Sequence, residues 1–224
     1  MKHALAYEWV RARSLRSTWL LLAAAGVPQF ASGLYWGLKR DLGAFTSAFG
    51  PAARLGALLV AAIGIAAFGL DRRHGTLATT RLVLRSPARI VAARALVTAG
   101  LALLGGLLMV VLTAAGVLTG GGALPAGAGA AGRAGAAVLP LTVLSGLAGV
   151  ALGGLLRHTG LAVGLFAAWT FVAETALAAL GCVPVTALPF SGTALFALPG
   201  TAVFAVLVVL ALGATTFTLA RRDG

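Results

Sequence analysis

The sequence predicts an all-α, polytopic membrane protein with six transmembrane helices. Of its 224 residues, 60% are hydrophobic and only 10% are charged, and the mean hydropathy is +1.01. A soluble domain of this length needs far more polar surface. The apolar residues also fall into six blocks, separated by charges or by Gly/Pro clusters. Each block is close to the roughly 20 residues that cross a bilayer core of about 30 Å as a helix.

These blocks define the predicted spans, which together form one transmembrane domain over residues 1–224. The second block is the weakest because Arg54 stands at its start and charges are costly inside a span. The predicted spans cover approximately residues 17–37, 53–70, 95–118, 136–156, 160–180 and 199–219.

The positions of Lys and Arg predict the orientation, because cytoplasmic loops carry an excess of both. With the N-terminus inside, four basic residues fall on the outer side: Lys39, Arg40, Arg54 and Arg133. The other thirteen fall on the inner side: Lys2, Arg11, Arg13, Arg16, Arg72, Arg73, Arg81, Arg85, Arg89, Arg94, Arg157, Arg221 and Arg222. We therefore expect both termini in the cytoplasm, in agreement with an even number of spans.

Residues 2–14 precede the first span and are predicted to form an interfacial helix on the inner leaflet. Helical spacing places Leu5, Trp9 and Ala12 on one face, with the basic residues largely elsewhere, which suits a helix lying in the membrane surface. The alternative is an ordinary positively charged flank. The N-terminal stretch also resembles a signal peptide with a cleavage site at 31–33, but its apolar block continues to Leu38, so we expect it to be retained.

Two connections on the outer side differ in composition. Residues 119–132 are rich in glycine and are predicted to form a flexible loop. Residues 181–200 are apolar, uncharged and broken by three prolines. This second segment is too interrupted to span, so we expect it to dip into the outer leaflet or to pack over the bundle.

Sequence motifs for several kinds of chemistry are missing. There is no GxxxxGK[ST] phosphate loop and no HExxH motif, so we expect no ATP hydrolysis by this chain, no catalytic residues, no metal site and no cofactor bound to it. The net charge of +12 is distributed between apolar blocks, which argues against nucleic-acid binding. The single cysteine, Cys182, excludes an internal disulfide.

Apart from Arg54 at the start of the second block, Glu174 is the only charged residue inside a predicted span. Such a residue is a functional candidate because an unpaired charge is costly in the membrane, and here it is a candidate for the substrate pathway. The alternative is a carboxyl held by Thr170 or by a neighbouring helix. Proton-driven or ion-driven carriers generally need several such groups along a path, which disfavours a secondary transporter.

Two pairs of glycines have the spacing that allows close helix contact. Gly160 and Gly164 are candidate dimer contacts, and Gly149 and Gly153 form a second pair. Such pairs arise easily in a chain rich in Gly and Ala.

The stretch 71–90 concentrates charge between the second and third predicted spans. Residues 75–85 can form a short helix with His74, Arg81 and Arg85 on one face, and with Leu77 and Leu84 offering apolar contacts. Ser86 followed by Pro87 predicts the start of the next helix. A simple positive anchor on anionic lipid would explain the arginines but not the extra apolar turn.

The sequence resembles the permease subunits of type-2 ABC exporters, chiefly those of bacterial drug, antibiotic and peptide export systems. The resemblance is carried by EWVRARSLRSTW at 8–19, by DRRHGT at 71–76, and by six spans with a Pro-broken connection before the last. Asp71 stands where that family commonly has glutamate. The likeness covers essentially the whole chain, although its motifs are short.

The resemblance implies that residues 75–86 form a coupling helix that docks into a separate ATPase subunit, and that residues 2–14 form an elbow helix. It also implies two permease copies, identical or paralogous, in a bacterial plasma membrane, with two ATPase subunits that bind ATP and Mg²⁺. The implied coupling residues are Asp71, His74, Gly75, Thr76, Leu77, Arg81, Leu84 and Arg85, and those of the interfacial helix are Glu8, Trp9, Arg11 and Arg13.

On this basis we expect half of the membrane pathway of an ATP-driven exporter, with a hydrophobic or amphiphilic cargo such as a drug, an antibiotic, a peptide or a lipid. One alternative is a stand-alone secondary transporter. Another is a membrane immunity or scaffold protein that transports nothing.

Overall fold

The computed structural model describes residues 2–39, 48–74, 86–124, 128–156, 158–195 and 197–221, and these ranges are helical apart from short connections. The long helices are α1 (Lys2–Ser14), α2 (Arg16–Leu38), α4 (Gly50–His74), α6 (Pro87–Thr119), α7 (Ala128–Leu155) and α11 (Leu198–Arg221). The remaining elements are α8 (Thr159–Ala167), the π-helix η1 (Ala168–Ala173), α9 (Glu174–Ala179), the 3₁₀ turn η2 (Val185–Ala187) and α10 (Pro189–Ala194).

Five helical segments of the described chain are long and apolar enough to cross a membrane, which confirms the prediction of an all-α, multi-pass membrane protein. They lie close to the predicted second to sixth spans: Ala52–Gly69, Ala88–Thr119, Gly135–Leu155, Thr159–Ala179 and Leu198–Arg221. The first predicted span corresponds to α2, whose 23 residues include Pro28 and Gln29. These two residues lower its hydropathy, so membrane crossing by α2 stays a prediction.

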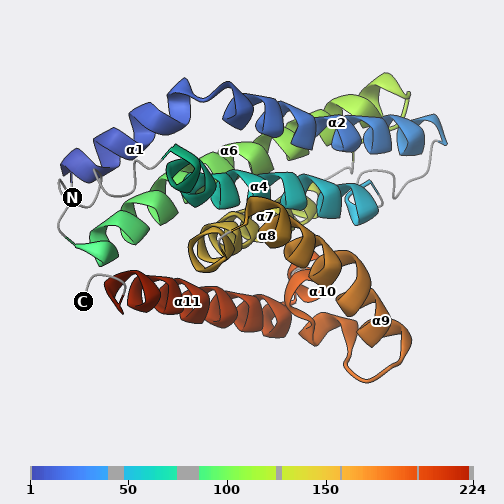
Figure 1. Cartoon of the computed structure of the whole chain (residues 1–224). Coiled ribbons are helices and arrows are strands. Elements are labelled where there is room, and N and C mark those ends of the chain that lie inside the picture. The colour runs from blue at the N-terminus through green and yellow to red at the C-terminus, as the bar shows by residue number, and fades with distance from the viewer. Residues whose placement is uncertain are drawn as a thin grey trace.

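Helices α1 and α2 run in the same direction, and α4 and α6 then run back and forth along the bundle (Figure 1). The start of α1, the end of α4, the start of α6 and the end of α11 lie together at one end, which we refer to as the N/C end. The end of α2, the start of α4, and α9 and α10 lie toward the opposite end. The helix ends that carry most of the basic residues therefore share one end of the molecule.

Helices α4 and α7 are in direct backbone contact. A Cβ atom at Gly149 would overlap the carbonyl oxygen of Ala61, and one at Gly64 would overlap that of Gly146. Small residues therefore let the two helices approach without side chains between them. The predicted pair Gly149 and Gly153 thus lies at a contact within the chain, since Gly153 packs against Ile65.

Helices α2 and α6 pack in the same way along the halves that lie away from the N/C end. A Cβ atom at Gly37 would overlap the carbonyl oxygen of Val117, and one at Gly116 would overlap that of Phe30. Helix α2 is therefore an integral part of the bundle rather than a peripheral leader.

Two predicted boundaries shift in the structure, and one is confirmed. Helix α4 continues through Asp71 to His74, so the start of the charged stretch is helical rather than a loop. Helix α6 begins at Pro87 after Ser86, as predicted, although the Ser86 side chain makes no capping hydrogen bond. The expected loop at 119–132 is wrong for residues 128–132, because helix α7 already begins at Ala128.

The Pro-broken segment packs on the bundle. Within it, Pro189, Phe190, Ser191, Gly192 and Thr193 of α10 are all buried. The Phe190 ring contacts Phe166 of α8 and Phe204 of α11, with ring centroids 6.3 Å apart in each case. Of the two arrangements expected for residues 181–200, packing over the helices matches the described contacts.

We expect Gly149→Ala to lower the free energy of unfolding by about 1–3 kcal/mol, because the added methyl group must push α7 away from α4. The matched control is Gly213→Ala in α11, where a Cβ atom meets nothing within 4 Å. Thermal unfolding of the purified protein in detergent should show a lower midpoint for the first variant only. Equal midpoints would contradict the close contact of the two backbones.

Candidate functional site

A buried ion pair joins α1 to α6 near the N/C end. The Nε atom of Arg94 donates a hydrogen bond of 3.0 Å to Oε1 of Glu8, and the two residues are only 1% and 3% exposed. The Arg94 guanidinium also lies over the ring of Phe68 in α4, 4.2 Å from its centroid. A buried charge pair of this kind stabilises the fold only while both partners are present, so it fixes the relative positions of three helices.

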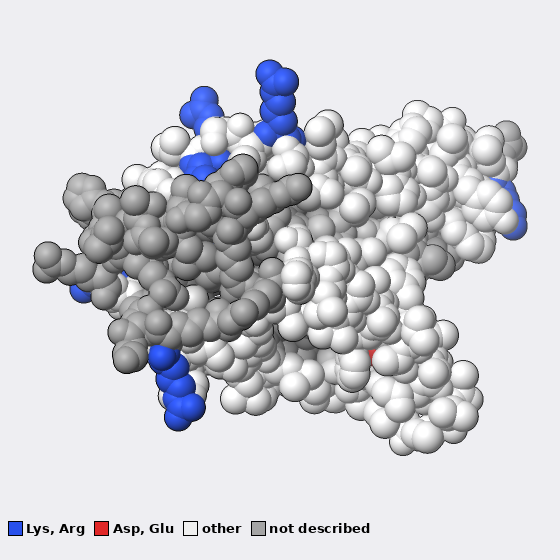
Figure 2. Space-filling view, in the orientation of Figure 1, with Lys and Arg blue, Asp and Glu red and all other residues white. Residues whose placement is uncertain are grey.

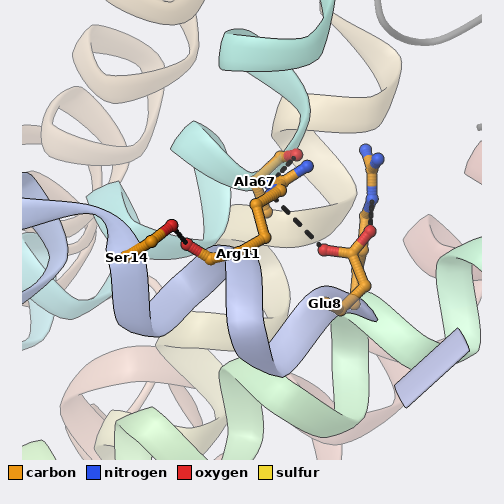
Figure 3. Close-up of polar contacts among 5 residues, drawn as sticks. Glu8, Arg11, Ser14 and Ala67 are labelled. Carbon is orange, nitrogen blue, oxygen red and sulfur yellow. Dashed lines mark hydrogen bonds and ion pairs between the residues drawn. The ribbon is translucent and has the colours of Figure 1, made fainter. Parts of the chain in front are cut away.

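Arg11 extends this cluster to the backbone of α4. Its side chain reaches from α1 toward α4, where it donates to the carbonyl oxygen of Ala67, and its Nε lies 3.6 Å from Oε2 of Glu8 (Figure 3). Ser14 donates to the carbonyl oxygen of Arg11 near the end of α1. We refer to Glu8, Arg11, Arg94, Phe68 and Ala67 as the anchor cluster.

The anchor cluster lies directly before the predicted coupling segment. Asp71 and His74 belong to the last turns of α4, a few residues after Ala67 and Phe68. The predicted contacts at Gly75, Thr76, Leu77, Arg81, Leu84 and Arg85 lie outside the described residues. Both helices that flank these residues, α4 and α6, are thus bound to α1 close to the ends that border this segment.

Helix α1 packs on the protein with a face other than the apolar face predicted for the inner leaflet. Ala4 and Glu8 are buried, whereas Trp9 is 43% exposed and Arg13 is exposed. The Arg13 backbone carbonyl accepts a hydrogen bond from Trp19 Nε1 across the break between α1 and α2. The outward position of Trp9 is compatible with an interfacial helix, which stays a prediction.

Glu174 is fully buried at the opposite end and holds the start of α10. Its two carboxylate oxygens accept hydrogen bonds of 2.7 Å from the backbone N–H groups of Phe190 and Ser191 and from the Ser191 hydroxyl. Trp169 Nε1 donates to the same carboxylate over 3.2 Å. The first N–H groups of a helix lack partners within the helix, so the carboxylate completes them and also complements the helix dipole.

Arg54 connects the same place to α4. Its guanidinium donates to the Thr170 carbonyl oxygen at 3.3 Å, and to the hydroxyls of Thr175 and Ser191, each at 3.2 Å. The Ser191 hydroxyl therefore links Arg54 to Glu174. We refer to Arg54, Glu174, Thr170, Thr175 and Ser191 as the clamp cluster.

The clamp cluster explains how the membrane-embedded carboxyl is tolerated. In the structure a neighbouring segment holds the Glu174 carboxyl, which agrees with the second interpretation of this residue given by the sequence. Thr170, which that interpretation also named, is not its partner. The Thr170 hydroxyl instead donates to the carbonyl oxygens of Phe166 and Ala167. A contact between Glu174 and a substrate stays a prediction.

The two candidate dimer contacts lie on the surface of the described chain. Gly160 and Gly164 are exposed on α8, and a Cβ atom at either position would meet nothing within 4 Å. They are therefore available for contact with another helix, unlike Gly149 and Gly153.

Charge is unevenly distributed over the face in Figure 2. The basic side chains gather mostly toward the N/C end, and the flank beyond them is almost entirely uncharged. This pattern agrees with a bundle whose flank faces lipid and whose charged end faces water.

Sequence reasoning missed the partners of both carboxylates. In the sequence, Arg94 contributes only to the basic excess of the inner side, and Arg54 only weakens the second predicted span. A usable signal existed, because the chain has only five acidic residues and a carboxylate among apolar residues needs a partner. The sequence does not show that Arg94 supplies it for Glu8, or that Phe190, Ser191 and Trp169 supply it for Glu174.

No model of a protein family matches the chain, and no curated protein matches it. Membership in the exporter family therefore stays a prediction from the residues quoted above.

We expect Arg94→Met to lower the free energy of unfolding by about 3–5 kcal/mol, because it leaves the Glu8 carboxylate buried without its main partner. The double variant Glu8→Gln/Arg94→Met should lose much less, since neither charge then remains. Unfolding by sodium dodecyl sulfate, followed by circular dichroism, measures both. Arg13→Met, at an exposed position, is the control and should change the value by less than about 0.5 kcal/mol. A double variant whose free energy of unfolding falls by the sum of the losses of its two single variants would contradict the pairing of Glu8 with Arg94.

We expect Glu174→Ala to release α10 from the bundle, because hydrogen bonds to a charged group contribute about 1.5–3 kcal/mol each. The probe is a cysteine at the fully buried Thr193 position, introduced as Thr193→Cys in a Cys182→Ser background. Its labelling by a thiol reagent should become about tenfold faster or more. Thr175→Ala, which removes one exposed hydrogen bond to Arg54, should leave labelling slow. Unchanged labelling in Glu174→Ala would show that α10 is held by packing alone.

Proposed function

We propose that this chain is the membrane-spanning permease subunit of an ATP-driven exporter, in which two such subunits form the pathway and separate ATPase subunits supply the energy. The proposal combines the resemblance at residues 8–19 and 71–76 with the geometry of the described helices. The energy source is ATP with Mg²⁺ on the partner subunits.

The proposal includes α2 as a sixth span, with both termini in the cytoplasm of a bacterial cell. The support is that α2 packs closely on α6, helix against helix. In addition, α1 begins and α11 ends at the same end of the bundle (Figure 1). An even number of crossings gives this arrangement.

The observation that carries the proposal is the position of the anchor cluster. A coupling element must transmit a movement of the ATPase to the spans. A flexible connection between the two would absorb that movement. The Glu8 and Arg94 pair and the bond from Arg11 to Ala67 connect α1 to α4 and α6, the two helices on either side of residues 75–85. Movement of that segment would therefore move three helices together.

The proposed cargo is hydrophobic or amphiphilic, because few charges occur within the spans. The segment Thr159–Ala179 is only 22% buried in the chain, and Leu198–Arg221 has the same value. Their exposed apolar faces are available for lipid, for the second permease copy and for a pathway between the copies. Gly160 and Gly164 are the proposed points of closest approach.

We expect Leu84→Asp to abolish transport and substrate-stimulated ATPase activity in vesicles that contain the permease and its ATPase. A charge in a packed subunit interface costs several kcal/mol, whereas a loop on the lipid surface can turn the side chain to water. The control is Thr79→Asp, which adds the same charge on the opposite side of the predicted helix 75–86.

The outcome separates the proposal from its alternatives. Loss of ATPase stimulation in Leu84→Asp, with normal insertion and with Thr79→Asp active, supports coupling through residues 75–86. Transport that persists in Leu84→Asp at normal expression would show that these residues are not the coupling element. Transport driven by an ion gradient without any ATPase would identify a secondary transporter instead, and the absence of transport would favour an immunity or scaffold protein.

A further inference from the structure

Arg54 of the clamp cluster is a partly buried arginine that no carboxylate of the described chain contacts directly. The acceptors of its guanidinium are three neutral oxygens, the Thr170 carbonyl and the hydroxyls of Thr175 and Ser191. By contrast, Arg11 and Arg94 both pair with Glu8. An arginine inside an apolar span calls for a partner, because its charge is costly there.

Glu174 is bonded to Arg54 only through Ser191. The Ser191 hydroxyl donates its proton to Glu174 and accepts from Arg54. The carboxylate receives three further hydrogen bonds, from Phe190, from the Ser191 backbone and from Trp169. Its acceptors are therefore taken by α10 and by Trp169, and the guanidinium keeps bonding capacity of its own.

Arg54 and Thr175 have hydrogen-bond donors to spare. A guanidinium has five N–H groups, and the three bonds of Arg54 leave at least two of them, with Nε–H included, without an acceptor among the described residues. The Nε atom is not enclosed by the protein. The Thr175 hydroxyl accepts from Arg54, and its own proton has no acceptor in the same ranges. Thr170 and Thr193 instead donate to a carbonyl of the preceding turn. Donors without acceptors, beside a positive charge, favour an anion as ligand.

These donors lie at the edge of an apolar surface. Arg54 is the third residue of the apolar segment Ala52–Gly69, at the end of α4 that lies away from the N/C end. Thr175 is exposed. Leu55 follows Arg54 and is 45% exposed, and Val172, one turn before Thr175, is 66% exposed. A ligand at this place meets charge at its head and hydrocarbon beside it, which is the environment of an amphiphile.

We propose that Arg54 and Thr175 bind the anionic head group, a carboxylate or a phosphate, of an amphiphile at this edge of the bundle. The Arg54 Nε–H group and the Thr175 hydroxyl donate to its oxygens, and the alkyl part leaves along Leu55 and Val172. The clamp bonds hold the guanidinium in place before the ligand arrives. The inference that this amphiphile is the exported cargo rests on the proposed function, whereas the binding itself is tested without transport.

The test uses the fluorescence of Trp169, which directly precedes Thr170 and is 43% exposed. The full-length chain carries Trp9→Phe, Trp19→Phe and Trp36→Phe and is purified in detergent. The probes are 5-doxylstearic acid, whose nitroxide quenches a nearby indole, and its neutral methyl ester. At alkaline pH, where the acid is ionised, we expect it to quench at about one fifth of the micellar mole fraction that the ester needs, since charge-assisted hydrogen bonds are roughly twice as strong as neutral ones.

Two variants remove the proposed donors. Arg54→Gln should make the two probes equal, and Thr175→Ala should reduce the preference for the acid, whereas Thr175→Ser should keep it. Lys39→Gln is the matched control, because it removes a charge from an exposed position at the end of α2, and it should keep the preference. Slow labelling of Thr193→Cys, in the Cys182→Ser background, verifies that α10 stays in place. If Arg54→Gln loosens α10, Thr175→Ala decides.

Equal quenching by the two probes with Arg54 and Thr175 intact would overturn the proposal, as would a Lys39→Gln variant that loses the preference. Displacement of the acid by millimolar inorganic phosphate would overturn the amphiphile and identify a site for a soluble anion. Displacement by an equal mole fraction of dioleoyl phosphatidylglycerol would overturn the assignment to a cargo and identify a membrane lipid. Because no ATPase is present, these results concern this site alone, whereas Leu84→Asp tests the exporter.

Discussion

Two buried carboxylates constrain how the described helices can be arranged. Glu8 and Glu174 are each at most 3% exposed. Each is satisfied by groups that come from distant parts of the sequence: an arginine 86 residues away for Glu8, and two backbone N–H groups 16 and 17 residues away for Glu174. A rearrangement that separates either carboxylate from its donors leaves it buried without partners, which is strongly destabilising.

The two clusters act at opposite ends of the same helix. Helix α4 carries Ala67 and Phe68 of the anchor cluster near its end and Arg54 of the clamp cluster near its start. Between them its backbone packs directly on α7 at Gly64. Because a helix with such close neighbours bends little, a displacement at one cluster is passed along α4 as a whole. The proposed coupling at the N/C end and the position of α10 are therefore mechanically connected.

The sequence predicted the helices well because each span is set by a local property, an apolar block with charged ends. It predicted the contacts poorly because those depend on which helices become neighbours. Gly149 and Gly160 have the same spacing motif, yet one packs against Ala61 and the other faces outward. Likewise, tertiary packing alone brings Arg94 to the Glu8 carboxylate and Arg54 to Ser191, whose hydroxyl donates to Glu174. Asp71 proved helical because α4 continues beyond its last apolar residue.

The π-helix η1 has a consequence for how this region can vary. A π-turn corresponds to one extra residue in an α-helix, and here it spans Ala168–Ala173, immediately before Glu174. Each residue of an α-helix rotates the following side chains by about 100°. Deletion of a single residue in this turn would restore regular α-helix and swing Glu174 away from α10, whereas the helix itself would persist. The orientation of the carboxylate thus depends on the length of this segment as well as on the identity of its residues.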